Sequence, residues 1–319
     1  MTSTPSRPIF VVAGARSFSL GAALADKLAS EARDSVILTV DSEPAPSSHP
    51  NIVARKFDLN PLQHPNGFEG WSAELYGLVR SVHKSVENPP PVQAVFLGVA
   101  RYDVSEYVSS TAADRAQILG SNILGKFEIL HAVMRLNFDL GFDNATVLGV
   151  FDIGSLHGLL HTANRSLYVS TKAASLALCR VLVNGSEVRN AVHIAPGRID
   201  TPMLHWNHWV LKENGDRGFP DLVRQHLPSL YDSVFRDGDA NALASALSQL
   251  GLEEAENQAV LGRYNDRRKM NLQTEEGIIS PESLASYLAS LMLDAGDRES
   301  GIVEVTAPLG CISVVRRPF

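Results

Sequence analysis

Short apolar segments that alternate with helix-length segments limit most strongly how this chain can fold. Seven of them are rich in β-branched residues, and between them apolar residues recur at the helical spacing of about 3.6. The predicted strands are Ile9–Val12, Val36–Val40, Ile52–Phe57, Val92–Gly98, Ala145–Ile153, Ala191–Ala195 and Gly301–Val305. The predicted helices include Leu20–Arg33, Phe68–Val86, Ala112–Phe138 and Ser166–Val183. Right-handed helical connections between such strands predict an α/β protein with a doubly wound, seven-stranded, mostly parallel sheet in three α/β/α layers.

One segment interrupts this alternation. Residues 203–279 contain no convincing strand, although helices are predicted at Pro220–His226 and Ala240–Leu250. We interpret residues 1–319 as a single domain in which 203–279 form an insertion, a substrate lid on the ligand side of the sheet. The alternative interpretation is a surface excursion without function. Ser280 as N-cap and Pro281 at the first helical position predict the start of the last helix. The tail, residues 306–319, is apolar enough to pack on its own subunit or on a neighbour's.

Charge and composition narrow the partners and the compartment. The formal net charge of −7 argues against nucleic acid as a main partner. No apolar run reaches the length of a membrane span, and the polar N-terminus does not resemble a signal peptide. Two cysteines cannot form a disulfide framework. We therefore expect a cytoplasmic protein that acts on a small molecule, without nucleic acid or membrane.

A nucleotide site is predicted after the first strand, where a turn flanked by Gly14 and Gly21 opens a helix. Small residues there let backbone N–H groups approach a pyrophosphate at the helix N-terminus. A middle glycine is missing, so the hydroxyl of Ser17 or Ser19 is a candidate replacement for one backbone contact. The residues predicted to bind cofactor in this turn are Gly14, Arg16, Ser17, Ser19, Leu20 and Gly21.

Acidic residues follow the next two strands. Asp41 closes the second strand, where a carboxylate can accept both ribose hydroxyls of the adenosine half and repels a 2′-phosphate. Arg16 instead favours NADP, because its guanidinium could pair with a phosphate. On balance the sequence favours NAD over NADP. Asp58 and Leu59, after the third strand, are placed to meet the adenine, although Asp58 could also be a simple turn residue.

Tyr168 and Lys172 are the candidate proton-transfer pair. Four residues apart on a helix, they lie on one face. An ammonium beside a phenol favours the phenolate and lowers the tyrosine pKa toward the physiological range. Ser155, thirteen residues upstream, ends the fifth strand.

With these pieces in order, the chain resembles the short-chain dehydrogenase/reductase family over nearly its whole length. The glycine turn, the Tyr168/Lys172 pair and Ser155 match motifs of that family. Gly98, in the segment Leu97-Gly98-Val99-Ala100, stands where the family has its Asn-Asn-Ala-Gly motif. Asn122, in the segment Asn122-Ile-Leu-Gly125, resembles the catalytic asparagine motif. The run from Pro196-Gly197 to Thr201 resembles the Pro-Gly-x-x-x-Thr loop that holds the nicotinamide amide and the phosphate.

The resemblance implies a Rossmann fold and a role for each matching residue. Tyr168 is implied to be the general acid in reduction and the base in oxidation, with Lys172 tuning it and bonding the nicotinamide ribose. Ser155 is implied to donate to the substrate oxygen. Asn122 is implied to position a water that links Lys172 to solvent. The implied cofactor residues of the later motifs are Gly98, Lys172, Pro196, Gly197 and Thr201. The Ser155–Tyr168 interval, Asn122 and the Pro196-Gly197 loop favour the single-substrate branch over the extended, epimerase-type branch.

The substrate is less well defined. His205, Trp206 and Trp209 follow the Pro196-Gly197 loop and suggest an aromatic or polycyclic alcohol or ketone, although the tryptophans could equally anchor the lid. His157 and His161 lie between Ser155 and Tyr168 and are placed to line the substrate entrance. Their spacing, like that of His205 and His208, lacks a carboxylate or thiol partner, so no metal site is predicted.

Three functions fit this pattern. The first is an NAD(H)-dependent oxidoreductase that interconverts a secondary alcohol and a ketone on a hydrophobic substrate. The second is an isomerase, lyase or cyclase on the same fold without net redox chemistry, suggested by the altered glycine turn and the large lid. The third is a non-catalytic dinucleotide sensor. The resemblance to the family also implies a homodimer or homotetramer, assembled through the helices Ala112–Phe138 and Ser166–Val183.

Overall fold

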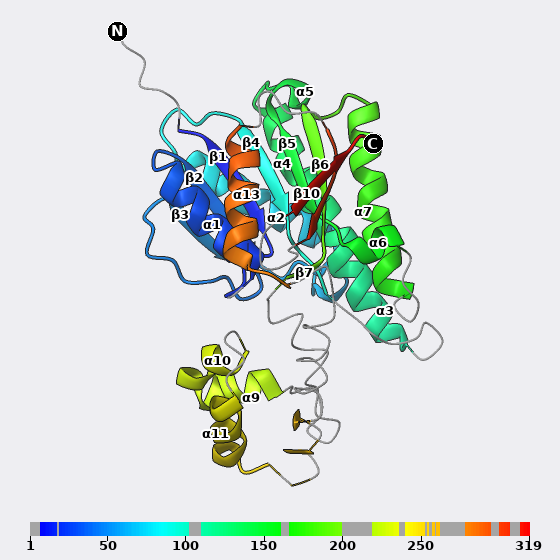
Figure 1. Ribbon diagram of the computed structural model, residues 1–319. Helices are drawn as coiled ribbons and strands as arrows, with labels where there is room; N and C mark the ends of the chain where they lie inside the picture. The colour runs from blue at the N-terminus through cyan, green and yellow to red at the C-terminus, as the bar shows by residue number, and fades with distance from the viewer. Residues whose placement is uncertain are drawn as a thin grey trace.

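An eight-stranded sheet with helices on both faces forms the body of the protein (Figure 1). The computed structural model describes residues 7–17, 19–101, 110–160, 166–199, 219–235, 240–252, 254, 257–258, 260–261, 278–294, 300–306 and 313–319. The strands are β1 (Ile9–Ala13), β2 (Val36–Asp41), β3 (Ile52–Lys56), β4 (Val92–Leu97), β5 (Gly149–Ile153), β6 (Asn190–Pro196), β9 (Gly301–Thr306) and β10 (Ser313–Arg317). Their order in the sheet is β10-β9-β6-β5-β4-β1-β2-β3. The short strands β7 (Arg198–Ile199) and β8 (Ile278–Ile279) pair separately.

The seven predicted strands are present, and they pair parallel with one another. The eighth strand, β10, runs antiparallel to β9 at the edge and is formed by the tail of the same chain. This pairing answers the question of where the tail packs, because Ser313–Arg317 adds its backbone hydrogen bonds to its own subunit's sheet. The sheet is therefore mixed, with one antiparallel edge.

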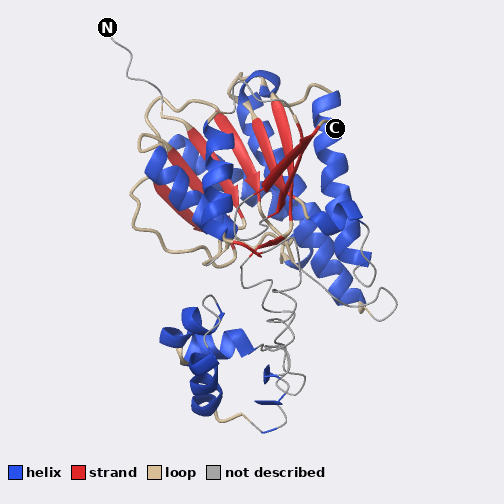
Figure 2. Cartoon of the chain, viewed as in Figure 1, coloured by secondary structure: helices blue, strands red, loops and turns tan. Residues whose placement is uncertain are grey.

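Helices cover both faces of the sheet, which gives three layers: helices, sheet and helices (Figure 2). One face carries α1 (Leu20–Glu31) and α13 (Pro281–Leu293). The other carries α2 (Gly67–Lys84), α4 (Lys126–Asp139) and α7 (Ser166–Asn184). The remaining helices are η1 (Pro61–Gln63), α3 (Ala112–Leu119), η2 (Gly120–Gly125), α5 (Asn144–Val147), α6 (Leu156–Leu160), α9 (Phe219–His226), α10 (Pro228–Phe235) and α11 (Ala240–Leu250).

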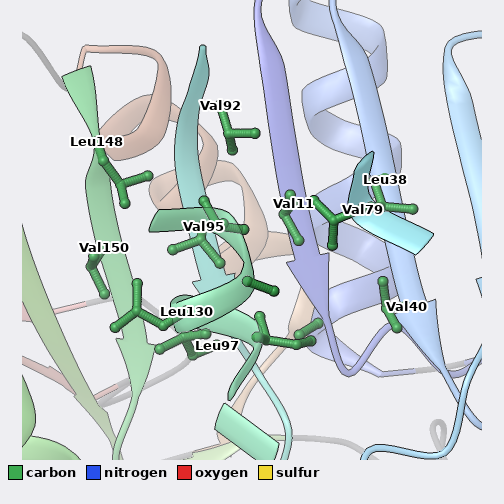
Figure 3. Close-up of a cluster of buried hydrophobic side chains, with 14 of the residues drawn as sticks. Val11, Leu38, Val40, Val79, Val92, Val95, Leu97, Leu130, Leu148 and Val150 are labelled. Atoms are coloured by element: carbon green, nitrogen blue, oxygen red, sulfur yellow. The ribbon is translucent and has the colours of Figure 1, made fainter. Parts of the chain in front are cut away.

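The core is divided by the sheet, because successive side chains of a strand point to opposite faces. In β1, Val11 belongs to the cluster under α2, α4 and α7, whereas Phe10 and Val12 belong to the cluster under α1 and α13. Figure 3 shows part of the first cluster, with valines and leucines of neighbouring strands meeting side chains such as Val79 and Leu130 from the helices. Burial on both faces explains why these strands appear in the sequence as continuous apolar runs.

Two local predictions differ from the structure. Residues 145–147 were expected to belong to the fifth strand, but they form the short helix α5. Asp143 caps that helix by accepting from Ala145 N, so β5 begins only at Gly149. The long predicted helix Ala112–Phe138 is present as α3, η2 and α4 in direct succession, and η2 is a π-helical segment around Asn122. Such segments occur often at functional sites.

The insertion contains the two predicted helices, as α9 and α11, together with α10. Their apolar side chains, with Val223, Val234 and Leu243 among them, form a small cluster of their own that also includes Val260 from beyond α11. The last helix starts as predicted, because Ser280 Oγ accepts from Ser283 N at 3.0 Å and Pro281 follows it. The role of 203–279 as a substrate lid stays a prediction.

Among the described helices, α7 alone is long and apolar enough to cross a membrane by length and composition. Its inner face, which includes Lys172 and Cys179, is buried. Core helices of globular proteins meet the same criterion.

Candidate active site

Several of the predicted site residues within the described part of the chain follow strands at the carboxyl end of the sheet. Parallel strands place their carboxyl ends together, and ligands of this architecture bind there, at the point where the strand order reverses. That point lies between β1 and β4, which are neighbours in the sheet. Gly14 follows β1, Gly98 follows β4, Ser155 lies two residues beyond β5, and Gly197 follows β6.

The glycine turn after β1 is built by close backbone approach. Gly14 has a φ of +82°, and a β-carbon on it would lie 2.7 Å from the carbonyl carbon of Gly98. A β-carbon on Gly21 would overlap the carbonyl oxygen of Gly14. The three glycines therefore allow the turn, the end of β4 and the start of α1 to meet, which explains Gly14 and Gly21 despite the missing middle glycine.

Ser19 closes this turn as the N-cap of α1. Its Oγ accepts from Ala22 N at 3.2 Å and donates to Gly14 O at 3.1 Å. The hydroxyl is thus engaged in capping, which weakens the idea that it replaces a backbone contact to a pyrophosphate. Ser17 is half-buried in the same turn, and Leu20 is the buried first residue of the helix. The first turn of α1 holds no acidic residue, so the positive end of the helix dipole is left for an anion.

Two carboxylates and one guanidinium lie at the end of β2. Asp41 Oδ1 accepts from Glu43 N at 3.0 Å, and the Arg16 guanidinium pairs with Glu43. Arg16 also forms an isolated bridge with Pro44. The positive charge of Arg16 is therefore already matched by a carboxylate of the chain.

Asp58 and Leu59 follow β3. Asp58 is exposed, its Oδ1 accepts from Asn60 N at 2.9 Å, and its backbone oxygen accepts from Trp71 Nε1 at 2.7 Å. Asp58 thus has the turn role that the sequence left open, while its exposure also leaves it accessible to an adenine. Leu59 is buried, and its carbonyl oxygen lies so close to Gly125 that a β-carbon there would overlap it.

Tyr168 and Lys172 both lie on the buried face of α7, as the spacing predicts. Tyr168 is 7% exposed and Lys172 is 1% exposed. Lys172 Nζ lies 5.4 Å from the centre of the Tyr168 ring and donates to Ile153 O at 3.0 Å. Ser155, two residues beyond Ile153, is 7% exposed. The lysine thereby joins the proton-transfer helix to the strand end that carries Ser155.

Asn122 is almost fully buried in the π-helical segment. Its Oδ1 accepts from Arg101 N at 2.5 Å, and its Nδ2 donates to Arg101 O at 2.8 Å and to Thr171 Oγ1 at 3.1 Å. The side-chain amide therefore ties the segment after β4 to α7, one residue before Lys172. Its role in holding a water stays a prediction.

A buried charged cluster that the sequence did not predict lies beside Lys172. Lys126 Nζ donates to Asp152 Oδ1 at 2.5 Å and to Ile153 O at 2.8 Å. The other carboxylate oxygen, Asp152 Oδ2, lies 2.8 Å from His193 Nδ1. All these side chains are at most 1% exposed. The sequence did hold a sign of this cluster, because a carboxylate in the wholly buried strand β5 and an imidazole in the wholly buried strand β6 each require a polar partner.

Burial and charge shift the acidity of this cluster. Burial lowers the pKa of Lys126 to about 8 and that of Lys172 to about 8, while the charge of Asp152 opposes both shifts. Burial alone would raise the pKa of Asp152, but the Lys126 ammonium and the hydrogen bond from His193 hold it well below its usual range. The carboxylate is thus ionised, and the two lysines titrate within the physiological range.

Cys179 completes the surroundings of the cluster from α7. Burial and the nearby Asp152 charge raise the pKa of its thiol well above the ordinary value. The donor atoms of Asp152, Cys179 and His193 lie within 4.8 Å of one another, a spacing that a metal ion could use. The Lys126 ammonium already bonds this carboxylate, however, so the chain itself supplies the positive charge there.

Several predicted residues fall outside the described part of the chain, namely Thr201, His161, His205, Trp206 and Trp209. His157 lies in α6, and its side chain is likewise outside the description. Pro196 is the last residue of β6, and Gly197 N donates to Val305 O at 2.8 Å, which fixes the start of the predicted nicotinamide loop.

These groups fit a dinucleotide. Close-packed glycine backbone, the uncompensated N-terminus of α1 and the carboxylate of Asp41 occupy the positions that a pyrophosphate and an adenosine ribose require. The Tyr168–Lys172 pair and Ser155 lie at the same sheet edge.

Comparison with known proteins identifies the fold. The chain matches the structure of a short-chain dehydrogenase family protein from Francisella tularensis with a TM-score of 0.60 and 11% identity, covering 94% of this chain and 97% of that one. It matches 3-ketoacyl-(acyl-carrier-protein) reductase from Brucella melitensis, complexed with NADH, with a TM-score of 0.60 and 12% identity over 94% and 96% of the two chains. It also matches a variant actinorhodin polyketide ketoreductase with NADPH, with a TM-score of 0.59 and 14% identity over 95% and 97%. No protein-family model and no curated protein matches the sequence.

The similarity extends over almost the whole of each chain, so the predicted three-layer α/β Rossmann fold is confirmed. At these identities the likeness concerns the fold, and the chemistry must be argued from the site.

Proposed function

We propose that this chain, which has the fold of short-chain dehydrogenase/reductase structures, is an NAD(H)-dependent oxidoreductase that interconverts a secondary alcohol and a ketone. The observation that carries the proposal is the position of Lys172, which is buried 5.4 Å from the centre of the Tyr168 ring and bonded to the strand end that leads to Ser155. In this proposal the acid–base pair and the Ser155 hydroxyl act on one substrate oxygen at the carboxyl end of the sheet. The nicotinamide dinucleotides in the matched reductase structures support the same class of reaction.

The residues divide the proton chemistry among them. The Lys172 ammonium favours the phenolate of Tyr168, so the tyrosine can give a proton to a ketone oxygen or take one from an alcohol. Ser155 donates a hydrogen bond to the same oxygen, where negative charge develops in the transition state. Asn122 holds the segment after β4 against α7 and so keeps Lys172 in place.

A bound nicotinamide cofactor supplies the hydride chemistry. Gly14, Gly21, Gly98 and the N-terminus of α1 would hold its pyrophosphate, and Asp41 its adenosine ribose. The Arg16–Glu43 pair supports NAD over NADP, because a guanidinium already neutralised by a carboxylate is less available to a 2′-phosphate. Thr201 remains part of this proposal as the end of the nicotinamide loop.

For the substrate we keep a hydrophobic, aromatic or polycyclic alcohol or ketone. The support is the sequence alone, through Trp206 and Trp209 next to His205, with His157 and His161 near the entrance. A reducing, cytoplasmic compartment is likewise proposed, and the free, fully buried thiol of Cys179 agrees with it.

Association of two or four copies through α4 and α7 is a separate proposal. Phe138 on α4 is 71% exposed and Val181 on α7 is 60% exposed, so each helix presents an apolar side chain that a partner could cover. Sedimentation of the wild type and of Val181→Asp tests it: we expect a dimer or tetramer that the substitution weakens, and a monomeric wild type contradicts the proposal.

The function is tested by Tyr168→Phe, which removes only the phenolic hydroxyl. A panel of ketones and secondary alcohols is screened by following the absorbance of the reduced nicotinamide. We expect wild-type turnover, loss of that turnover in Tyr168→Phe, and nearly unchanged NADH affinity. The matched control is Tyr76→Phe, which removes a hydroxyl bonded to Asp139 on the outer side of α2 and α4.

Turnover that persists in Tyr168→Phe contradicts the assigned role. Tight NADH binding without turnover of any substrate favours an isomerase, lyase or cyclase that retains its cofactor, whereas the absence of NADH binding contradicts the dinucleotide site itself.

A further inference from the structure

Two lysine side chains converge on one backbone carbonyl at the end of β5. Lys126 Nζ and Lys172 Nζ donate to Ile153 O at 2.8 and 3.0 Å. The first comes from the start of α4 and the second from α7, and both are fully buried. Two ammonium groups in one buried place disfavour each other, because like charges repel and burial penalises each charge.

Only one of these lysines has a carboxylate of its own. Asp152 Oδ1 bonds Lys126, and its other oxygen is taken by His193. In the part of the chain that the structure describes, Lys172 Nζ bonds a backbone carbonyl and pairs with no carboxylate. The carboxylate therefore favours the protonated form of Lys126 most directly, whereas the Lys172 ammonium has only a carbonyl oxygen as its partner there.

We propose that Lys126 is a positioning residue of the catalytic centre, which together with Asp152 and His193 sets the protonation of Lys172. This inference rests on the proposed role of Lys172 beside Tyr168. It adds to that role a second, buried lysine on α4 that acts through the first.

The charged and titratable groups around the two lysines come from β5, β6 and α7. Among the described residues, Asp152 on β5 supplies the carboxylate of this cluster, and His193 on β6 bonds it. From α7, Cys179 carries a thiol that burial keeps protonated, and Tyr168 carries the phenol beside Lys172. With both lysines protonated, two ammonium groups face one carboxylate, and this excess of positive charge favours proton release from one lysine.

The position of His193 shows that this arrangement is tightly built. A β-carbon on Gly154 would overlap the imidazole at Nε2, so the ring lies directly against the backbone between Ile153 and Ser155. Gly154 N also donates to Ile194 O, next to His193 in β6. The same short segment thus receives both lysines at Ile153, supports His193 at Gly154 and carries Ser155.

The functional consequence is an upper pH limit. Lys172 favours the Tyr168 phenolate only while it is an ammonium. Burial lowers the pKa of both lysines to about 8, and repulsion between their two ammonium groups acts in the same direction, so the limit should lie near that pH. The pH at which turnover declines should therefore follow the charge at residue 126.

The first test uses the wild type without substrate or cofactor. Lysine side chains labelled with ¹³C at Cε are followed by NMR across a pH titration, and Lys126→Met and Lys172→Met assign the two buried signals. We expect both signals to change over one common pH range near 8, with shared inflections, because strongly interacting groups titrate as a pair. A single Lys172 inflection at the ordinary lysine value, or one independent of Lys126, overturns the proposal.

Two variants should shift the titration midpoint of Lys172 in opposite directions. Lys126→Met removes the repelling charge and leaves Asp152 to Lys172, so the Lys172 midpoint should rise by about one pH unit or more. Asp152→Asn removes the carboxylate that stabilises both ammonium groups, so the midpoint should fall. The alkaline limit of kcat should shift the same way, whereas a merely structural role would lower kcat without moving either midpoint. An unchanged midpoint in Lys126→Met overturns the proposal.

Removing one partner of a buried ion pair can unfold a protein. The double variant Lys126→Met/Asp152→Asn removes both charges together, and in it the titration of Lys172 should become a single inflection. A titration that keeps two inflections there contradicts the coupling. Lys27→Met is the matched control, because Lys27 pairs with Glu31 on the exposed side of α1 and its loss should leave Lys172 unchanged.

The titration separates this inference from the proposed function. Coupled lysine signals without any turnover support the cluster and contradict the oxidoreductase. Turnover that depends on Tyr168, together with independent lysine signals, supports the oxidoreductase and contradicts the role of Lys126.

Discussion

Asn122 and Asn137 each bind a backbone segment that is distant in the sequence, and they do so with the same pair of hydrogen bonds. Each is buried, and each uses its amide to accept from the N–H and donate to the C=O of one residue, Arg101 for Asn122 and Val92 for Asn137. Asn137 anchors the start of β4 and Asn122 anchors the segment beyond its end. The two differ in their third bond, because Asn122 donates to Thr171 on α7 and Asn137 donates to Asn144.

This likeness makes the two residues a matched pair for mutation. Asn122→Ala and Asn137→Ala should each lower the free energy of unfolding by about 2–4 kcal/mol, because buried backbone groups lose their partners. Only Asn122→Ala should also reduce turnover at a temperature where both variants are folded. Urea unfolding and the nicotinamide absorbance assay measure the two effects, and equal losses of turnover would contradict a specific role for Asn122.

Gly154 should not tolerate a side chain. In Gly154→Ala the new methyl group overlaps His193 Nε2, so either the imidazole or the strand end must move, at a cost of about 1–3 kcal/mol. Turnover should fall with stability, because Ser155 is the next residue. The control is Gly77→Ala in α2, where a β-carbon meets nothing within 4 Å. That substitution should leave the protein unchanged or slightly more stable, and an equally stable Gly154→Ala would contradict the packing described.

Stability should rise with pH between about 8 and 9. Lys126 and Lys172 have pKa values lowered from 10.5 to about 8 in the folded chain. Above pH 8 the unfolded chain therefore binds more protons than the folded one, and the free energy of unfolding increases with pH. Each proton of difference contributes about 1.4 kcal/mol per pH unit. Urea unfolding at a series of pH values measures the slope.

Cys179 should limit this rise. Its thiol stays protonated in the folded chain, so above the ordinary thiol pKa the unfolded chain loses that proton first. This difference opposes the contribution of the lysines to the free energy of unfolding. In Cys179→Ala the increase with pH should therefore continue further into the alkaline range. A wild-type stability that is flat or falling from pH 8 to 9 would contradict the buried lysine charges.

Asp41 and Glu43 should control the choice between the two nicotinamide dinucleotides. Asp41→Ala removes the carboxylate expected to repel a 2′-phosphate, and Glu43→Gln releases Arg16 to bind one. Together they should shift the NADPH-to-NADH affinity ratio toward NADPH by about tenfold or more, equivalent to about 1.4 kcal/mol.

Fluorescence titration with both reduced cofactors measures that ratio. Asp26→Ala removes an exposed carboxylate from the middle of α1 and controls for net charge. If the ratio stays constant in the double variant, the adenosine end of the site has been placed wrongly.

The sequence by itself determined the elements and much of the candidate site. Strand and helix periods are local properties, so the alternation along the chain was enough to predict the parallel sheet with helices on both faces. The Tyr168–Lys172 pair was visible for the same reason, since a spacing of four residues places both on one helical face. The α5 turn was missed because one capping bond, from Ala145 N to Asp143, outweighed an apolar pattern that suits a strand.

Only the tertiary structure decided what surrounds Lys172. Lys126 and Asp152 are 26 residues apart, and Asp152 and His193 are 41 residues apart. They meet because β5 and β6 pair with Asp152 opposite His193, and because α4 and α7 pack on the same face of those strands. Charges so distant along the chain interact only after the sheet has formed and water has been excluded, and burial then strengthens their interaction and shifts their protonation.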